Sequence, residues 1–162
     1  MKIVLTCLPF FNHVFTPSLP LAYLKSYLQQ DKDVEVKVID LEVHYFRSAV
    51  ITSSVSLYWD EMWSYDYNER IINDEKKSVL NEFVQMLLTE NPWAVGFSVA
   101  HSNILFTRYV ARELKRLHPE IYIIYGGRYF CLKEKWRSLV AGWHRQFSEA
   151  DCIVKNEGEA TL

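Results

Sequence analysis

Cysteine and glycine are both scarce in this chain of 162 residues, which contains three cysteines and five glycines. Cys7, Cys131 and Cys152 lie far apart and form no CxxC pair, so they provide neither a disulfide framework nor the ligand spacing of a zinc ribbon or an iron–sulfur cluster. The first glycine is Gly96, so no glycine-rich turn follows the first predicted strand. This excludes a dinucleotide-binding fingerprint and a P-loop at that position.

The chain also lacks an excess of charge of one sign and a long hydrophobic run. Its formal net charge of -2 argues against a nucleic-acid or anionic-membrane partner. No apolar run reaches the roughly 18 residues that a membrane span needs. The apolar stretch from Ile3 superficially resembles a signal peptide, but it has no small-residue cleavage site and Pro9 interrupts it. We therefore expect a cytoplasmic protein with no nucleic-acid and no membrane partner.

What the chain does contain is an ordinary globular composition with many aromatic residues. Hydrophobic residues make up 49% of the chain, charged residues 23% and aromatic residues 15%. A chain of this length can bury a core without a metal or a disulfide. We predict a single domain over residues 1–162, with an irregular, aromatic-rich insertion at about 41–75 in which short helical turns are expected.

The pattern along the chain alternates strands with helices. Short continuous apolar runs predict buried strands, and apolar residues at helical spacing predict the helices between them. Strands are predicted at 3–8, 34–38, 93–99, 121–125 and 151–155, and helices after Ser18, at 79–87, at 106–117 and around 133–147. In the second strand, valines alternate with charged residues, which is typical of a half-exposed strand at the edge of a sheet.

This alternation predicts an α/β fold with a parallel sheet and helices on both faces. Right-handed crossovers and an edge position for the second strand favour a flavodoxin-like (Rossmann-like) sheet of order 2-1-3-4-5. Ligands of such sheets bind at the carboxyl ends of the strands. In this chain that edge is predicted to consist of segments 9–18, 98–103, 126–130 and 156–159.

Two features at this edge point to a binding site. Gly126 and Gly127 allow a ligand or another backbone segment to approach closely, although a plain turn explains the pair equally well. Ser98 can form one hydrogen bond with a ligand at an otherwise apolar site, or can bond to the local backbone. Ser98 also stands where a phospho-receiver domain needs an aspartate. Asp40, which ends the second strand, is predicted to cap a helix or loop.

Several short segments then occur in a familiar order and spacing. They are PSLPLAYLKSYL at 17–28, VIDL at 38–41, VGFS at 95–98, RELK at 112–115 with HP at 118–119, YGG at 125–127 and NEGEATL at 156–162. With these segments, nearly the whole chain resembles the N-terminal cobalamin-binding-type domain of cobalamin-dependent radical SAM enzymes.

The resemblance implies that this chain is the cobalamin-binding module of such an enzyme. It implies that the corrin lies across the strand edge, that the nucleotide tail runs beside Ser98 and the two glycines, and that the cofactor carries the chemistry. No catalytic side chain and no protein ligand to a metal is expected. The cofactor-binding residues that it implies are Pro9, Phe11, Asn12, Ser18, Ser98, His101, Asn103, Gly126, Gly127, Glu157 and Gly158.

The chain departs from the family pattern at the loop after the first strand. Classical cobalamin domains carry a DxHxxG loop whose histidine coordinates cobalt, whereas residues 11–16 read FNHVFT. His13 has no orienting carboxylate in this loop, so we expect it to be a loop or packing residue. The SxL pattern of the third strand is also changed, because Ala100 stands in place of the leucine.

The chain also lacks the CxxxCxxC motif of the catalytic barrel. A radical SAM barrel with its [4Fe-4S] cluster and S-adenosylmethionine is therefore expected in the same longer chain or in a separate protein. The complete enzyme would perform radical chemistry, often methyl transfer, on a peptide or small-molecule substrate. The alternative is a vestigial domain that binds no cofactor and serves as a docking platform for the barrel or the substrate, with residues 41–75 as an interaction surface.

Overall fold

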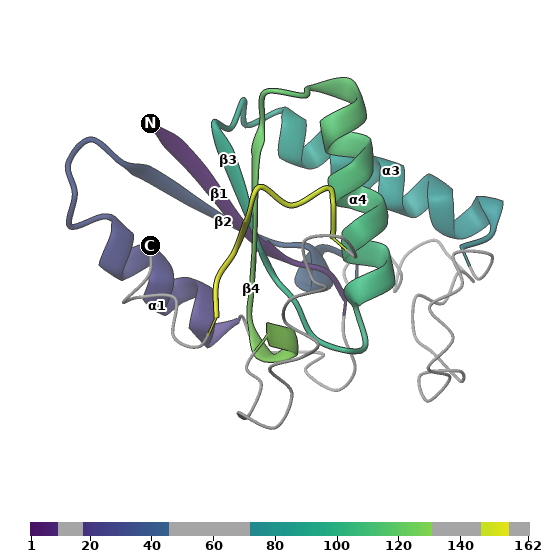
Figure 1. The fold of residues 1–162 in the computed structure, drawn as a ribbon, viewed down its shortest axis with the longest axis horizontal. Coiled ribbons are helices and arrows are strands. Elements are labelled where there is room, and N and C mark those ends of the chain that lie inside the picture. The colour runs from purple at the N-terminus through teal and green to yellow at the C-terminus, as the bar shows by residue number, and fades with distance from the viewer. Residues whose placement is uncertain (10–17, 46–71, 131–146, 156–162) are drawn as a thin grey trace.

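Five strands alternate with helices in the part of the chain that the computed structural model describes, residues 1–9, 18–45, 72–130 and 147–155 (Figure 1). The strands are β1 (Lys2–Cys7), β2 (Glu35–Asp40), β3 (Ala94–Ser98), β4 (Tyr122–Gly126) and β5 (Cys152–Ile153). The helices are α1 (Leu19–Leu28), α3 (Asp74–Leu88) and α4 (Ile104–Leu117), with a 3-10 turn at Arg128–Phe130. Another helical segment covers residues 41–45.

All five strands are parallel and lie in the order β2-β1-β3-β4-β5. This confirms the predicted flavodoxin-like α/β sheet, including the edge position of β2. In β2, Val36 is buried while Glu35 and Lys37 on either side of it are exposed, as the alternating pattern predicts. The central strands β1 and β3 are buried over nearly their whole length, because helices cover both of their faces.

Two hydrophobic layers hold the helices to the two faces of the sheet. The larger one joins α3 and α4 to the sheet through residues such as Phe83, Val110 and Phe97. The smaller one joins α1 to the opposite face, where Leu21 packs with Leu5 of β1. Figure 1 shows α1 on one side of the strands and α3 and α4 together on the other.

Some element boundaries differ from those predicted. α3 begins at Asp74, five residues before the predicted apolar stretch starts at Val79, because its first turn is polar. Asn73 caps this turn, and its side chain accepts a hydrogen bond from the backbone N–H of Lys76. Of the predicted insertion at 41–75, residues 41–45 are helical and 74–75 belong to α3, while 46–71 lie outside the described residues, as does most of the helix predicted around 133–147.

A buried ionic contact fixes the segment before β5 against α4. Glu149 is 6% exposed, and its carboxylate lies 3.0 Å from Nε of Arg108. The guanidinium group of Arg108 also lies over the ring of Phe147. The hydroxyl of Tyr125 donates to the same carboxylate at 3.2 Å. Burial and this neighbouring carboxylate raise the pKa of Tyr125, so its hydroxyl stays protonated and remains a donor.

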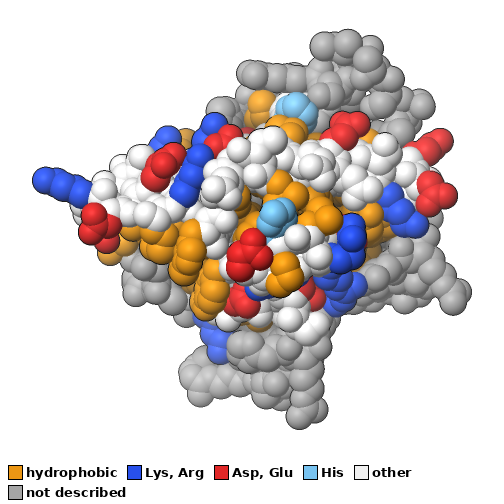
Figure 2. Space-filling view, turned by 90° about the horizontal axis from the view of Figure 1, so that it is seen from above, with side chains coloured by type: hydrophobic (Ala, Val, Ile, Leu, Met, Phe, Trp, Pro, Cys, Tyr) orange, Lys and Arg blue, Asp and Glu red, His pale blue; other side chains and the backbone are white. Residues whose placement is uncertain are grey.

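The surface at the amino ends of the strands mixes charged with apolar groups. Figure 2 shows acidic, basic and hydrophobic side chains interspersed on one face of the molecule. Trp93 and Tyr122, which flank the amino ends of β3 and β4, are exposed and stack with ring centroids 5.6 Å apart.

Within the described residues, none of the helices has the length and apolar character required to span a bilayer.

Candidate functional site

The carboxyl ends of β3 and β4 bring together the serine and the two glycines that the sequence singled out. Ser98 and Gly126 are paired in register, and Gly127 follows with a φ of 97°. A Cβ on Gly127 would lie 2.8 Å from the backbone nitrogen of Val99 and 3.2 Å from Oγ of Ser98. Glycine is therefore required at position 127 by its own conformation and by the backbone after β3. Of the alternatives left open by the sequence, close approach of another backbone segment accounts for this glycine.

Gly126 is in a different situation although it is the adjacent residue. Its φ is not positive, and among the described residues a Cβ added to it would have a single neighbour within 4 Å, Cβ of Val154 at 3.7 Å. That distance is an ordinary van der Waals contact. Its carbonyl accepts a hydrogen bond from the backbone N–H of Val99 at 2.8 Å, an interaction that any residue could make. Neither packing nor backbone conformation requires glycine at this position.

The face of β3 that points toward α1 carries only small residues. Ala94 belongs to the hydrophobic layer beneath α1, and the alternation of side chains along a strand places Gly96 and Ser98 on the same face. Leu5 fills part of the space over Gly96, since a Cβ there would lie 2.8 Å from its Cδ2. Together with Gly126 on β4, these residues leave the carboxyl end of this face without a large or charged side chain on β3 and β4.

The loop after β3 is held by a buried asparagine. Asn103 is 1% exposed, and its Nδ2 donates to the carbonyls of Leu8, at 3.2 Å, and Ser98, at 3.3 Å. Its Oδ1 accepts from the backbone N–H of Ala100 at 2.8 Å. Asn103 thus ties the end of β1 to the end of β3. Its predicted contact with a cofactor stays a prediction, but its amide already has a structural use.

The other predicted contact residues lie around this edge or outside the described part of the chain. Pro9 is buried directly after β1, and the backbone N–H of Ser18 donates to Asp40 at 3.1 Å. His101 is exposed, with its ring centroid 4.7 Å from that of Tyr129. The remaining predicted residues, Phe11, Asn12, Glu157 and Gly158, lie outside the described residues together with His13.

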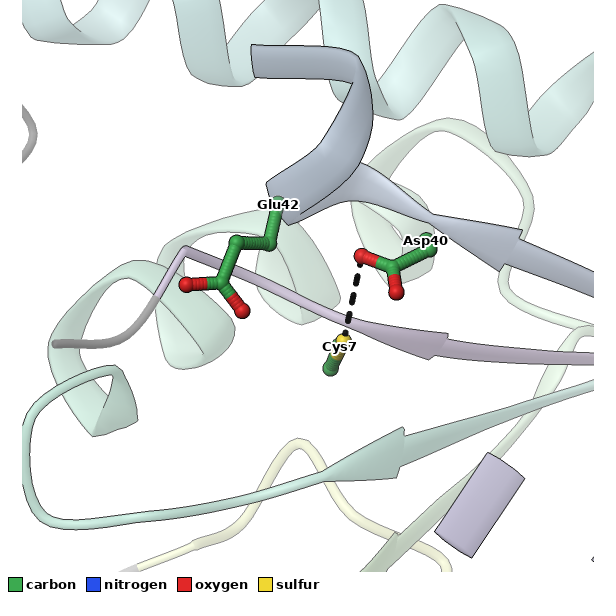
Figure 3. Close-up of side chains that lie close together, drawn as sticks. All are labelled: Cys7, Asp40 and Glu42. Atoms are coloured by element: carbon green, nitrogen blue, oxygen red, sulfur yellow. Dashed lines mark hydrogen bonds between the residues drawn. The ribbon is translucent and has the colours of Figure 1, made fainter. Parts of the chain in front are cut away.

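The carboxyl ends of β1 and β2 carry a second group of polar side chains, Cys7, Asp40 and Glu42 (Figure 3). Cys7 and Asp40 are paired in register on neighbouring strands. The thiol of Cys7 lies 3.6 Å from Oδ1 of Asp40. Cys7 is 2% exposed and Glu42 is 4% exposed. Burial and the two neighbouring carboxylates raise the pKa of the Cys7 thiol, so the thiol is protonated at neutral pH in the absence of a bound cation.

Asp40 also has a structural role, as the sequence predicts. Its Oδ1 accepts from the backbone N–H of Val43 at 3.1 Å, so Asp40 caps the helical segment 41–45. Its Oδ2 accepts from the backbone N–H of Ser18, the residue before α1. One carboxylate therefore fixes the start of two helical segments at the end of β2.

Sequence reasoning did not identify Cys7, Asp40 and Glu42 as a group. Cys7 and Asp40 are 33 positions apart, and no motif spacing connects them. The signal that was available is topological: each follows or ends a predicted strand, and neighbouring parallel strands end at the same edge.

Neither a scan against protein-family models nor a search of curated proteins finds a match for this chain. The fold and the arrangement of side chains at the sheet edge therefore provide the basis for a functional hypothesis.

Proposed function

We propose that this chain is a cobalamin-binding module that acts with a radical SAM barrel, located in the same longer chain or in a separate protein. The observation that carries the proposal is the small-residue surface at the carboxyl ends of β3 and β4, formed by Ser98 and Gly126. It lies beside the switch point between β1 and β3, where parallel sheets of this order bind their ligands. A flat, amide-rich, uncharged cofactor suits such a surface better than a phosphate or a metal ion does.

The residues present fit this group at the positions that are described. The fold does not require a glycine at position 126. Glycine there leaves space next to the ends of β3 and β4 that a Cβ would fill. The hydroxyl of Ser98 is half-buried at the same place and can donate to or accept from a cofactor amide. Gly127 shapes the turn through its φ of 97°, and it acts on a ligand only through that turn.

Cobalamin supplies the reactive cobalt centre, and this chain's contribution is to bind and orient the cofactor. The [4Fe-4S] cluster and S-adenosylmethionine belong to the barrel partner in this proposal, and the substrate is a peptide or a small molecule. No side chain of this chain takes part in the reaction itself.

The proposal is tested by titrating the chain with hydroxocobalamin and following its absorption spectrum. Gly126→Val should weaken binding at least tenfold, about 1.4 kcal/mol, because its side chain fills the cofactor's place. The fold should survive, because the φ of Gly126 is not positive and the new Cβ makes an ordinary contact with Val154 among the described residues. Tyr122→Val is the matched control, since it changes an exposed residue at the opposite end of the same strand. Absence of binding to the wild-type chain, or equal affinity for Gly126→Val, would remove the cofactor site from this edge.

A second function, a docking platform without cofactor, is favoured by one observation. Leu19, Tyr23 and Tyr27 of α1 are 79%, 64% and 42% exposed, and their spacing places them on one face of the helix. Exposed apolar residues grouped in this way are typical of surfaces that contact another protein. If cobalamin does not bind, this function is the one to pursue, beginning with Tyr23→Ala in a binding assay with the barrel protein.

A further inference from the structure

Three potential metal-binding side chains meet at the carboxyl ends of β1 and β2. The sulfur of Cys7 and one carboxylate oxygen each from Asp40 and Glu42 all lie within 4.8 Å of one another. Figure 3 shows Asp40 joined to the Cys7 thiol by a hydrogen bond, with the Glu42 side chain beside them on the helical segment that follows β2. These residues belong to the β1–β2 half of the edge, whereas Ser98 and Gly126 belong to the β3–β4 half.

Burial makes this grouping different from an exposed acidic surface. Cys7 and Glu42 are 2% and 4% exposed, and Asp40 is half-buried between them and Ser18. Two carboxylates at such short range repel each other, and removal from water strengthens that repulsion. Burial and the two carboxylates raise the pKa of the Cys7 thiol, and a backbone hydrogen bond from Glu42 acts in the opposite direction. A bound divalent cation offsets the repulsion and stabilises the thiolate at the same time.

The distances fit tetrahedral coordination. Zinc binds cysteine sulfur at about 2.3 Å and carboxylate oxygen at about 2.0–2.2 Å, so the sulfur and oxygen on one edge of a zinc tetrahedron are about 3.5–3.7 Å apart. The Cys7 sulfur and Oδ1 of Asp40 are separated by 3.6 Å. A carboxylate oxygen of Glu42 lies within 4.8 Å of both other ligand atoms, which brings it to the same site. An octahedral site for magnesium would use oxygen ligands alone, so the sulfur selects against it.

We propose that Cys7, Asp40 and Glu42 form a binding site for a zinc ion, with three protein ligands and a fourth position available to water or another small ligand. On binding, the Cys7 thiol loses its proton to solvent and the sulfur–zinc bond forms, while no group is oxidised or reduced. Asp40 keeps its hydrogen bonds to Ser18 and Val43, since each carboxylate oxygen has a second lone pair for the metal.

The test uses Co²⁺ as a spectroscopic substitute for Zn²⁺ on the full chain, after treatment with a reductant and a chelator. We expect one equivalent of Co²⁺ to produce a sulfur-to-metal charge-transfer band together with the intense visible bands of tetrahedral cobalt. Addition of Zn²⁺ should then remove both. The charge-transfer band should be absent in Cys7→Ser, and Glu42→Gln should lower the affinity for Co²⁺ at least tenfold.

Two further variants keep the test decisive. Cys152→Ser is the matched control, because Cys152 is the other described cysteine and lies on β5, and this variant should keep the wild-type spectrum. Cys7→Ala replaces Cys7→Ser if burial of a hydroxyl prevents folding. The proposal is overturned if no sulfur band appears, if the band persists without Cys7 or disappears without Cys152, or if Glu42→Gln binds Co²⁺ as tightly as the wild-type chain.

Discussion

The two halves of the sheet's carboxyl edge use different chemistry at equivalent positions. The β1–β2 half presents a thiol and two carboxylates, of which Cys7 and Glu42 are buried. The β3–β4 half presents a hydroxyl and two glycines at Ser98, Gly126 and Gly127. Both halves face α1, yet one suits a cation and the other an uncharged ligand.

In each half, a residue with an assigned structural role stands beside a proposed binding residue. Asp40 caps a helical segment and anchors the start of α1, whereas Glu42 adds a second buried carboxylate next to it. Gly127 is required by its φ and by the Val99 backbone, whereas Gly126 is not. A substitution at Asp40 or Gly127 therefore mixes folding with binding. The neighbouring residue Gly126 separates the two effects.

The largest expected effect is that of Gly127→Val on the stability of the fold. A β-branched residue at a φ of 97° is strained, and its Cβ would lie 2.8 Å from the Val99 nitrogen. We expect the free energy of unfolding to fall by about 3 kcal/mol or more, from the sum of backbone strain and overpacking. Urea denaturation without any ligand measures it. A loss below about 1 kcal/mol would show that the turn can adopt another conformation.

The next largest loss of stability is expected from substitution of Asn103, which ties the end of β1 to the end of β3. Asn103→Leu leaves the carbonyls of Leu8 and Ser98 and the N–H of Ala100 without their side-chain partner. We expect a loss of about 2–3 kcal/mol, because buried polar groups without partners carry the full cost of desolvation. The matched control is Asn81→Leu on the exposed face of α3, which should change stability by less than about 1 kcal/mol. Equal losses for the two variants would contradict a special role for Asn103.

The β1–β2 half of the edge can be examined through Asp40, which caps the helical segment 41–45. Asp40→Ala removes the acceptor for the backbone N–H groups of Val43 and Ser18, and we expect it to cost about 1–2 kcal/mol. Asp40→Asn keeps one side-chain oxygen and should lose less. Thermal unfolding in the presence of a chelator isolates this structural effect from any bound cation. If the two variants are equally destabilised, the negative charge contributes more than the cap.

The order of the sheet could be predicted because each strand has its own local signal. The alternating valines of β2 indicated an edge strand, and the continuous apolar runs of β1, β3 and β4 indicated the three inner strands. The start of α3 was missed because its polar first turn, from Asp74, has no apolar periodicity, and only the Asn73 cap indicates it.

The site was predicted less completely, and for a physical reason. Ser98 and the glycines were found because they are unusual residues at strand ends. The proximity of Cys7 to Asp40 depends on the register between β1 and β2, which the sequence alone does not specify to the residue. The close approach of Val99 to Gly127 depends in the same way on the path of the loop that Asn103 holds.

The smallest expected effect is that of Gly126→Ala, and it sharpens the comparison most. Gly126 and Gly127 are adjacent and look equivalent in the sequence, but in the described part of the chain a Cβ on Gly126 contacts only Cβ of Val154, at 3.7 Å. Alanine restricts the unfolded chain more than glycine does, so Gly126→Ala should leave the free energy of unfolding unchanged or raise it by up to about 1 kcal/mol. Gly127→Ala, its matched control, should lower it because of the positive φ at that position. Urea denaturation of the two variants side by side gives the difference directly. A loss of more than about 1 kcal/mol for Gly126→Ala would mean that the fold itself requires both glycines, and the glycine at 126 would then no longer support a ligand at this edge.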